Sequence, residues 1–387
     1  MWLTVFASLF AALVAVALYR AVRQFRHYQS LEPAPSLGAA TLPSLAVIVP
    51  VRNEERTIGS CLTGLLGQHY PEGRLELIVV DDNSSDHTTA LVRRTAEASR
   101  VRLLESTSLP QGWAGKPFAC WRGALAARAD WLCFVDADTL AEPALMQAAI
   151  VCARRRQLDM LSLEPFQELT GFLDRLVIPL GFLAIAATQD LARVNQGETV
   201  EATANGQFIL FRAESYFAIG GHAAVRGAIC EDSALARLVK AAGLQLAVLG
   251  AEKMMRTQMY ANGAALWEGL SKNVTEIYGG SPRTLIGSAG LLLIGWSAVL
   301  LPIWSATATI GDPAPLAFAA LVLAVAGSLA VFATHIATAR HFRIPIWYGL
   351  LLPLSCSVGA LIAFNAVLCR RRGRIAWKGR VYARAGK

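Results

Sequence analysis

Apolar positions are concentrated in long runs on either side of a mixed central region. Three runs nearly free of charge are each long enough to span a bilayer as a helix. They cover residues 2–19, 285–309 and 314–337. A fourth run, residues 345–368, is interrupted by Pro353. Residues 44–280 have the composition of an ordinary globular domain. The pattern predicts an N-terminal membrane anchor, an α/β domain and a C-terminal membrane region. A cleaved secretory signal is the alternative for the N-terminal run, but its charges follow rather than precede it and no small-residue cleavage pattern intervenes.

The central region begins with alternating predicted strands and helices. Leu45–Pro50 is a continuous apolar run, typical of a parallel strand buried on both faces, and Leu75–Val80 is a second one. Between them, Ile58–Leu66 has apolar residues at helical spacing. This order predicts a doubly wound sheet, in which ligands bind beyond the carboxyl ends of the strands.

Polar residues follow each predicted strand, including the one in "WLCFVDADTL" (Trp131–Leu140). They are Asn53 and Glu54, Asp81 and Asp82, and Asp136 and Asp138. In an extended strand Asp136 and Asp138 would point to the same face, where like charges repel. Several carboxylates at one sheet edge favour Mg²⁺ or Mn²⁺, held together with substrate phosphates. Helix or turn capping by Asp82 or Asp138 is the alternative interpretation.

Charge and motif content narrow the class of protein. The net charge is +8, and a basic cluster beside the last apolar run favours anionic lipid head groups over nucleic acid. This tail cluster contains Arg370, Arg371, Arg372, Arg374, Lys378 and Arg380. The seven cysteines have no paired metal-binding spacing and are expected to be reduced. No phosphate-binding Gly-x-x-x-x-Gly-Lys and no Gly-x-Gly-x-x-Gly follows the first strand, which disfavours an NTPase and a dinucleotide oxidoreductase.

Six segments together resemble family 2 glycosyltransferases with the GT-A fold, which implies an α/β domain with a doubly wound mixed sheet. In chain order they are "VIVPVRNEE", "VVDDNSSDHT", "GWAGKPFACWRG", "FVDADT", "GGH" and "CEDSALARLVKAAG". They extend over about residues 45–245. The segment "LPQGWAGKPFACWRG" and the tail "WKGRVY" (Trp377–Tyr382) are further similar to the membrane-bound branch of hopene-associated and carotenoid-acid glycosyltransferases, and more distantly to ceramide glucosyltransferases.

The resemblance implies a donor site. Asp138 would bind a Mn²⁺ or Mg²⁺ ion that bridges the diphosphate of a nucleotide sugar, and Asp136 would meet the ribose or the water shell of the metal. Asp82 would pair with the uracil edge. Lys116 would approach the ribose or phosphate, with a solvated surface lysine as the alternative. The base and ribose would be lined by Pro50, Arg52 and Glu54.

The reaction also needs a base, because an acceptor hydroxyl is a poor nucleophile until its proton is removed. The resemblance assigns this role to Asp232, with Glu231 as the second candidate; a carboxylate favoured by the helix dipole is the alternative. Gly206 would let the acceptor approach closely. Residues 163–192 are apolar-rich and would either lie in the membrane interface and deliver a lipid, or form a buried helix of the domain.

The chain departs from the processive members of the family, which carry Gln-x-x-Arg-Trp near the membrane. Gly263 and Leu266 stand where Gln and Arg would be, and only Trp267 remains. Trp267 fits a core position as well as a sugar-stacking one. We therefore expect a single transfer rather than polymer extrusion, with Arg256 or Lys272 supplying positive charge near the diphosphate.

These features predict an inverting, metal-dependent glycosyltransferase that moves one sugar, from a UDP-linked donor, to a hopanoid, carotenoid or sphingolipid-like membrane lipid. A non-catalytic nucleotide-sugar-binding scaffold would not need the acidic pair or Lys116. A lipid transporter would carry charges within its spans. The expected division is an anchor (1–29), a linker (30–43), the GT-A domain (44–250), an acceptor segment (251–284), a membrane region (285–369) and a basic tail (370–387).

Membrane orientation follows from the basic residues. Those after the first run are Arg20, Arg23 and Arg26, and they place the central domain in the cytoplasm, at the inner membrane. Three full crossings after that domain would leave the basic tail outside, against the same tendency. Because Pro353, Ser355 and Ser357 interrupt residues 345–368, we expect a re-entrant hairpin there, three true spans and a cytoplasmic tail.

Overall fold

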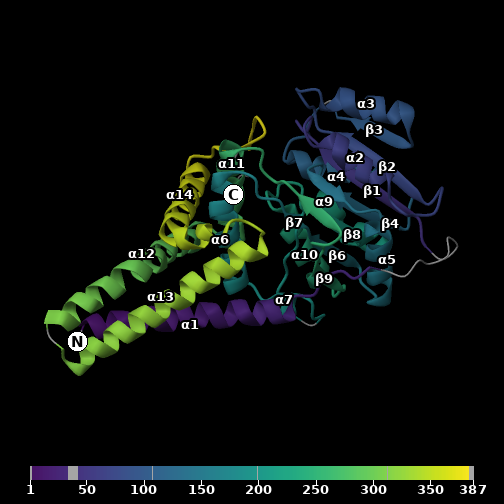
Figure 1. Ribbon diagram of the computed structural model, residues 1–387. Helices are drawn as coiled ribbons and strands as arrows, with labels where there is room; N and C mark the ends of the chain where they lie inside the picture. Colours follow the sequence, from purple (N-terminus) through teal and green to yellow (C-terminus); the bar gives the residue numbers. More distant parts are fainter. Residues whose placement is uncertain (1, 34–41, 107, 198, 312, 383–387) are drawn as a thin grey trace. The chain divides into compact units, whose positions relative to one another are not determined.

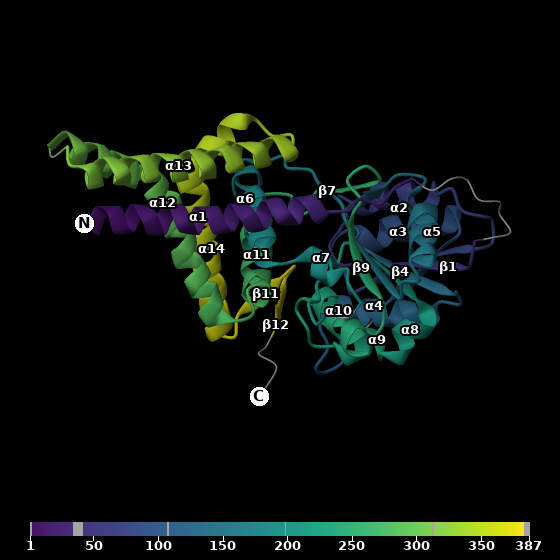
Figure 2. The same cartoon turned by 90° about the horizontal axis from the view of Figure 1, so that it is seen from below.

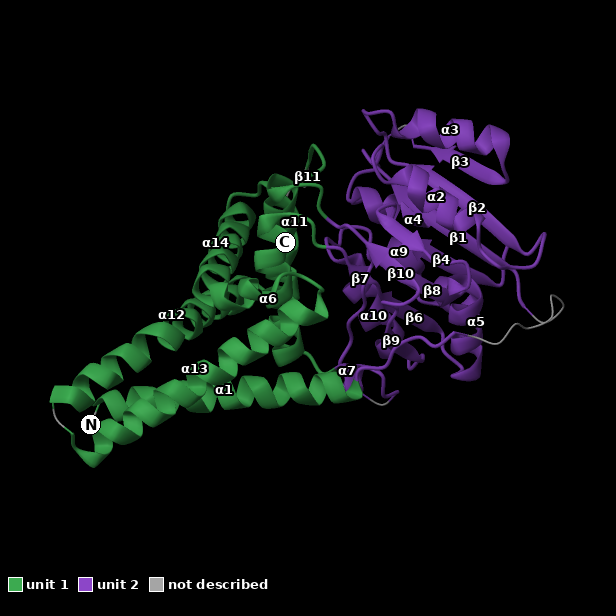
Figure 3. Ribbon diagram, in the orientation of Figure 1, with its two compact units in different colours: residues 1–27, 169–190, 260–384 green, residues 28–168, 191–259, 385–387 purple. Residues whose placement is uncertain are grey.

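The computed structural model describes residues 2–33, 42–106, 108–197, 199–311 and 313–382. The chain divides into two compact units (Figure 3). Unit 1 comprises residues 1–27, 169–190 and 260–384, and unit 2 comprises residues 28–168, 191–259 and 385–387.

The large sheet of unit 2 is mixed, as predicted (Figure 1). Strand β8 (Phe208–Arg212) runs antiparallel to its neighbours β4 (Trp131–Val135) and β6 (Met160–Glu164), whereas the other neighbouring strands pair in parallel. The carboxyl ends of the parallel strands therefore share one edge. In order across the sheet, the strands are β3 (Val101–Glu105), β2 (Leu75–Asp81), β1 (Leu45–Val51), β4 (Trp131–Val135), β8 (Phe208–Arg212), β6 (Met160–Glu164) and β9 (Leu246–Gly250).

The continuous apolar runs form strands of this sheet because both faces of the sheet pack against a hydrophobic core. In β1, Leu45, Val47 and Val49 pack into one core with α2 (Ile58–Leu66) and α5 (Leu145–Arg155). Ala46 and Ile48 pack into the other core with α4 (Gly115–Ala126) and α10 (Glu231–Ala241). Successive side chains in a strand point to opposite faces of the sheet, so alternate residues of β1 enter different cores. The helices of unit 2 are α2 (Ile58–Leu66), α3 (Thr88–Ala98), α4 (Gly115–Ala126), α5 (Leu145–Arg155), α7 (Leu191–Val194), α8 (Ala213–Ala218), α9 (Gly221–Ala224) and α10 (Glu231–Ala241).

The expected conformation of the two carboxylates after β4 is wrong. The strand ends at Val135, and Asp136 and Asp138 lie in a turn, so the alternation of an extended strand does not apply to them. The turn is closed by the backbone N–H of Thr139, which donates to the carbonyl of Asp136 at 3.3 Å. Beyond it, β5 (Thr139–Ala141), β10 (Met255–Thr257) and β7 (Phe166–Gln167) form a small sheet in the order β5-β10-β7.

The beginning of the expected linker extends the large sheet. Leu31 donates its backbone N–H to the carbonyl of Gly250 at 2.7 Å, and Gly250 donates to the carbonyl of Gln29 at 2.8 Å. Ser30 forms a parallel bridge with Gly250. Residues 34–41 of the linker lie outside the described residues. The segment leaving the anchor is thus attached to the edge strand β9.

Unit 1 contains the apolar helices. Within the described residues, four helices are long and apolar enough to cross a membrane: Trp2–His27, Ser281–Gly311, Pro315–His341 and Ile346–Arg371, the last combining η2 with α14. The helical elements of unit 1 are α1 (Trp2–His27), α6 (Phe172–Thr188), α11 (Gly263–Ile277), α12 (Ser281–Gly311), α13 (Pro315–His341), η2 (Ile346–Leu351) and α14 (Leu352–Arg371), followed by the hairpin strands β11 (Ile375–Trp377) and β12 (Arg380–Tyr382).

Helix α6 belongs to unit 1, so residues 163–192 do not form a buried helix of the α/β domain. Leu180 of α6 packs in the same core as Phe10 of α1 and Ala298 of α12. At the other end of the segment, Asp190 forms a 3.0 Å ion pair with Arg23. The interface alternative for this segment stays a prediction. The expected domain boundaries also stay a prediction, although the structure groups residues 169–190 with the apolar helices.

The predicted hairpin within residues 345–368 is wrong. Helix α14 is uninterrupted from Leu352 to Arg371. Pro353 lies in its first turn, where a missing N–H leaves no hydrogen bond unmade. The proline therefore begins a helix rather than breaking one. Figures 1 and 2 both show α14 running across the direction of α1 and α13 rather than along it.

The contacts of α14 show where the tail lies within unit 1. In the first half of α14, Ser357 Oγ accepts from the indole of Trp296 on α12 at 3.2 Å, whereas Arg370 at its end lies beside Glu276, before α12 begins. The two helices therefore run antiparallel. At the end of α14, Arg370 forms an ion pair with Glu276 and donates to Thr275 Oγ1 at 3.3 Å, just before α12 begins. The tail therefore starts at the end of unit 1 where α12 begins.

This arrangement predicts that Arg372 and Pro313, which lie near opposite ends of α12 and are both exposed, face opposite sides of the membrane. In a background without the seven native cysteines, Arg372→Cys and Pro313→Cys should react with an impermeant maleimide from opposite sides. Labelling of intact cells and inverted vesicles measures this. Reaction of both cysteines from the same side would contradict it.

Candidate active site

The residues after β1 and β2 are tied together at the carboxyl edge of the sheet. Arg52 donates from Nη1 to the backbone carbonyls of Asp82, at 2.6 Å, and Asn83, at 2.9 Å. The backbone N–H of Asp82 donates to the carbonyl of Val51 at 2.8 Å, and the Asp82 residue is buried. These bonds position the two strand ends as one rigid edge.

Glu54 and Pro50 belong to the same edge. The backbone N–H of Glu54 donates to Thr88 Oγ1 at 2.7 Å, and its carboxylate accepts from Thr57 Oγ1 at 3.1 Å. Pro50 lies beside Val80 in the register of β1 and β2. The structure thus brings together Pro50, Arg52, Glu54 and Asp82, as the sequence predicts.

Lys116 connects several separate segments. Its Nζ lies 2.7 Å from Asp136 Oδ1 and 3.0 Å from Glu231 Oε1, and it donates to the carbonyl of Gly206 at 3.3 Å. The lysine comes from the first turn of α4, Asp136 from the end of β4 and Glu231 from the start of α10. The alternative of a solvated surface lysine is therefore wrong.

Asp232 is held next to this ion pair. Its Oδ2 accepts from the backbone N–H of Gly206 at 3.0 Å, and its Oδ1 accepts from that of Ser233 at 2.6 Å. A Cβ at position 206 would lie 3.1 Å from Lys116 Nζ and 3.2 Å from Asp232 Oδ2. Glycine at this position allows the backbone to approach both groups. The expected approach of an acceptor to Gly206 stays a prediction.

Burial sets the electrostatics of the pair. It raises the pKa of Asp232 to about 6, with the charge of Glu231 adding to the effect and Lys116 opposing it. Burial also acts to lower the pKa of Lys116, but Asp136 and Glu231 outweigh it and hold this pKa well above its usual range. The site therefore combines a permanently charged ammonium with a carboxylate that titrates near neutral pH.

The buried pair His222 and Tyr216 receives no role from the sequence, although His222 belongs to the segment "GGH" that resembles the family. His222 Nδ1 and Tyr216 Oη are 2.8 Å apart, and the backbone N–H of His222 donates to the same hydroxyl at 3.1 Å. Burial lowers the pKa of His222 to about 3, so the imidazole is neutral. Gly221 has a φ of +49°, and a Cβ there would lie 2.4 Å from the Tyr216 ring. We infer a packing role for the pair.

The donor set around Asp138 suits a divalent ion that is shared with a substrate. Thr257 Oγ1 donates to the backbone carbonyl of Asp138 at 3.1 Å and thereby fixes the turn. Within the described residues, no group of three or more His, Cys, Asp or Glu side chains could hold a metal. Mg²⁺ needs only one or two protein carboxylates when phosphates and waters supply the other ligands. Asp138 and Asp136 fit that arrangement.

The three remaining candidates lie apart from the acidic pair in sequence. Arg256 is exposed on β10 and lies 3.6 Å from Glu168. Lys272 and Trp267 are on α11 of unit 1, and Lys272 Nζ lies 5.0 Å from the centroid of the Trp377 ring. Trp267 is 36% exposed whereas Leu266 is 1% exposed, so Leu266 is the core residue of this turn. The roles of Arg256, Lys272 and Trp267 toward donor or acceptor stay predictions.

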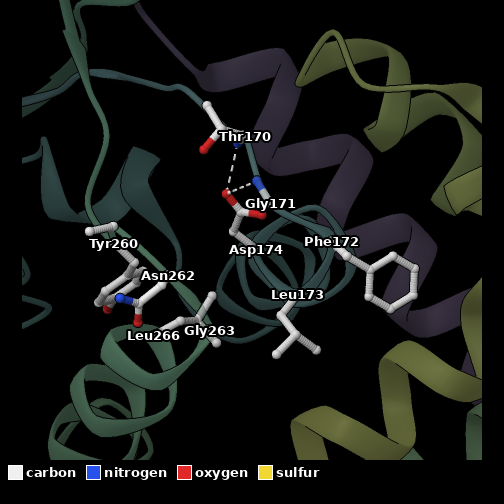
Figure 4. Close-up of a pocket in the computed structure, with 10 residues that line it drawn as sticks. Thr170, Gly171, Phe172, Leu173, Asp174, Tyr260, Asn262, Gly263 and Leu266 are labelled. Atoms are coloured by element: carbon white, nitrogen blue, oxygen red, sulfur yellow. Dashed lines mark hydrogen bonds between the residues drawn. The ribbon is translucent and has the colours of Figure 1, made fainter.

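Unit 1 has a pocket of about 170 Å³ between the N-terminal ends of α6 and α11 (Figure 4). Asp174 accepts from the backbone N–H groups of Thr170, at 2.8 Å, and Gly171, at 3.0 Å. Asn262 caps α11 by accepting from Ala265 at 3.0 Å. The lining is mostly apolar and includes Phe172, Leu173, Tyr260 and Leu266.

Comparison with known proteins finds similarity to family 2 glycosyltransferases, the family that the sequence motifs resemble. Residues 46–158 match the family model described as Glycosyl transferase family 2. The 4,4'-diaponeurosporenoate glycosyltransferase of Staphylococcus aureus strain USA300 is 28% identical over 241 residues, which are 62% of this chain and 62% of that protein. Its counterpart in strain MRSA252 is 27% identical over 253 residues, which are 65% of this chain and 66% of that protein. The chain therefore matches less than two thirds of the length of these relatives.

Among solved structures, the mannosyltransferase PcManGT from Pyrobaculum calidifontis, in complex with GDP-Man and Mn²⁺, has a TM-score of 0.57 at 18% identity. The alignment covers 95% of this chain and 98% of that one. The mixed sheet and this likeness define the GT-A fold. Residues 46–158 thus resemble family 2 glycosyltransferases, and unit 1 contains helices apolar enough to cross a membrane.

The Lys116 network predicts a stability effect. Lys116→Met would leave the carboxylates of Asp136 and Glu231 without their shared cation. We expect a loss of roughly 2–3 kcal/mol in unfolding free energy, less than for a fully buried pair because the lysine is partly exposed. The melting temperature of the purified protein measures this. The exposed control Lys253→Met should change stability by less than about 0.5 kcal/mol; equal effects of both changes would contradict the prediction.

Proposed function

We propose that the chain is an inverting, metal-dependent glycosyltransferase that transfers one sugar from a nucleotide sugar to a membrane lipid. The observation that carries this proposal is Asp232. It is a half-buried carboxylate with a pKa of about 6, held by Gly206 and placed beside the Lys116–Asp136 ion pair at the carboxyl edge of the sheet. This is the chemistry of a general base next to a donor site.

The proposed reaction is a single displacement. Asp232 takes the proton of the acceptor hydroxyl while the acceptor oxygen forms a bond to the anomeric carbon. The bond from that carbon to the diphosphate breaks on the opposite side, so the configuration inverts and a nucleoside diphosphate leaves. Lys116 keeps Asp136 and Glu231 oriented, and its charge opposes that of Glu231, which would otherwise raise the pKa of Asp232 further.

A divalent cation, Mn²⁺ or Mg²⁺, would be held by Asp138 and would neutralise the charge that develops on the leaving diphosphate. Asp136 would meet the ribose or the water shell of the ion. The Mn²⁺ in the PcManGT complex supports a divalent cation as part of this proposal. For the base, Asp82 could accept from the N3–H of uracil, with Pro50, Arg52 and Glu54 lining the base and ribose. Arg256 would supply a further positive charge.

We propose a lipid acceptor of the hopanoid, carotenoid or sphingolipid type. The apolar helices of unit 1 and the carotenoid-acid substrate in the name of the Staphylococcus aureus relatives support this choice. The pocket at the start of α6 and α11 would take part of the acceptor, close to Trp267 and Lys272 in the sequence. The protein would lie in the inner membrane, with its catalytic unit and basic tail in the cytoplasm. No nucleic-acid partner is expected.

An assay with membranes tests the function directly. Membranes containing the chain are incubated with a panel of labelled nucleotide sugars, and the extracted lipids are examined for a monoglycosylated product. Transfer from a UDP-sugar is expected. Donor binding without transfer would favour the nucleotide-sugar-binding scaffold, and lipid movement without glycosylation would favour a transporter.

The base assignment predicts a selective loss. Asp232→Asn keeps the shape of the side chain but cannot take a proton, so turnover should fall by roughly 10²–10⁴-fold while donor binding survives. In the wild type, kcat/KM should rise as the pH increases through about 6, because the base must be ionised, and then level off. Calorimetric donor titration and pH–rate profiles measure both effects. Parallel loss of binding and turnover would make Asp232 a structural residue.

The metal assignment predicts that Asp138→Ala and EDTA each abolish transfer. Added Mn²⁺ or Mg²⁺ should restore the EDTA-treated wild type but not the variant. Glu97→Ala removes an exposed carboxylate from α3 and should keep activity. Full activity of the wild type in EDTA would contradict a role for the metal.

A further inference from the structure

Gly269 in the middle of α11 leaves a notch that two aromatic rings fill. A Cβ at this position would lie 2.5 Å from Tyr260 Cε1 and 2.8 Å from Trp377 Cζ3. Glycine inside a helix costs about 1 kcal/mol relative to alanine, so its presence needs a packing reason. The reason here is the close approach of Trp377, which belongs to the C-terminal hairpin.

The hairpin carries a lysine in an unusual conformation. Strand β11 pairs antiparallel with β12, and Trp377 is opposite Arg380. Lys378 and Gly379, which join them, have φ values of +46° and +76°. Such two-residue turns favour Asn, Asp or Gly at their first position, because other side chains are strained there. The turn places Lys378 Nζ 5.7 Å from the centroid of the Trp377 ring.

A second lysine reaches the same ring from α11. Lys272 Nζ lies 5.0 Å from the Trp377 centroid. Each lysine gains from the ring, but two ammonium groups around one indole repel each other. An anion beside the ring would be attracted by both ammonium groups. The surrounding tail adds further positive charge, from Arg371, Arg372, Arg374 and Arg380.

We propose that Lys272, Trp377 and Lys378 form a binding site for the phosphate of an anionic membrane phospholipid. The position within unit 1 favours this occupant. The tail starts where α14 ends and α12 begins, at one end of the apolar helices, and its base is fixed there by Arg370, Glu276 and Thr275. Tryptophan and lysine are enriched where such helices meet lipid head groups, and each basic residue near an anionic leaflet contributes to binding.

The site depends on docking of the hairpin. Trp377 connects the turn that carries Lys378 to the helix that carries Lys272, so the two cations share a site only while its ring occupies the notch at Gly269. A larger residue at position 269 should separate them without removing any charge. The inference rests on the membrane location, not on the sugar-transfer activity, and can fail while the enzyme proposal stands.

Lipid binding to the purified full-length protein in a non-ionic detergent tests the site. Native mass spectrometry counts bound phosphatidylglycerol, or phosphatidylcholine with the same acyl chains. We expect the wild type to prefer phosphatidylglycerol. Lys272→Gln and Lys378→Gln should each weaken phosphatidylglycerol binding roughly fivefold and leave phosphatidylcholine binding unchanged. Equal binding of the two lipids by the wild type would overturn the proposal.

Two controls separate this site from general charge and from the donor site. Arg371→Gln removes one exposed charge from the last residue of α14 and should weaken binding less than about twofold. Gly269→Ala should reproduce the loss seen with Lys378→Gln, and an unchanged melting temperature would exclude misfolding as its cause. An Arg371→Gln loss as large as that of Lys378→Gln, no effect of Gly269→Ala in the folded protein, or displacement of phosphatidylglycerol by a nucleotide sugar would each overturn the proposal.

Discussion

The ion pair between Lys116 and the carboxylates of Asp136 and Glu231 holds the candidate site together. The lysine reaches these groups and the carbonyl of Gly206 from the first turn of α4. Since Asp136, Glu231 and Gly206 come from three other segments, one ammonium group fixes the relative positions of the donor edge and the proposed base. A neutral side chain of similar length could pack in the same space, but it could not compensate two carboxylates that are largely removed from water.

Much of the fold could be predicted because its signals are local. A continuous apolar run such as Leu45–Pro50 fits a strand with a core on each face, and the structure places alternate residues of β1 in two cores. Ile58–Leu66 is a helix with the predicted bounds. Polar residues after strands could be predicted to lie at one edge of the sheet for the same reason, since the carboxyl ends of parallel strands meet there. Their function at this edge stays a prediction.

The rest depends on contacts between distant residues. Nothing near Lys116 in the sequence indicates that Glu231, more than a hundred positions later, is its partner. Pro353 predicted an interruption, but a proline near the start of a helix costs nothing, and only the tertiary position of α14 reveals that it begins there. The sequence around Gly269 likewise does not indicate why a glycine is needed there, because the ring that packs against it belongs to Trp377 of the tail hairpin.

Burial of acids at the carboxyl edge has opposite consequences for stability and for the proposed chemistry, because the protonated acids favour the folded state whereas the base must be ionised. Burial raises the pKa of Asp232 to about 6, and it raises that of Glu164, at the end of β6, to about 7, where the charge of Glu252 adds to the effect and Tyr28 opposes it. A carboxyl whose pKa is higher in the folded state than in the unfolded state binds more protons when folded. Its contribution to stability is therefore complete at acid pH and is lost as the pH rises from about 4 through the folded pKa values. The base, however, works only when ionised. The same burial that tunes Asp232 for proton transfer thus makes the working form of the domain less stable than its protonated form.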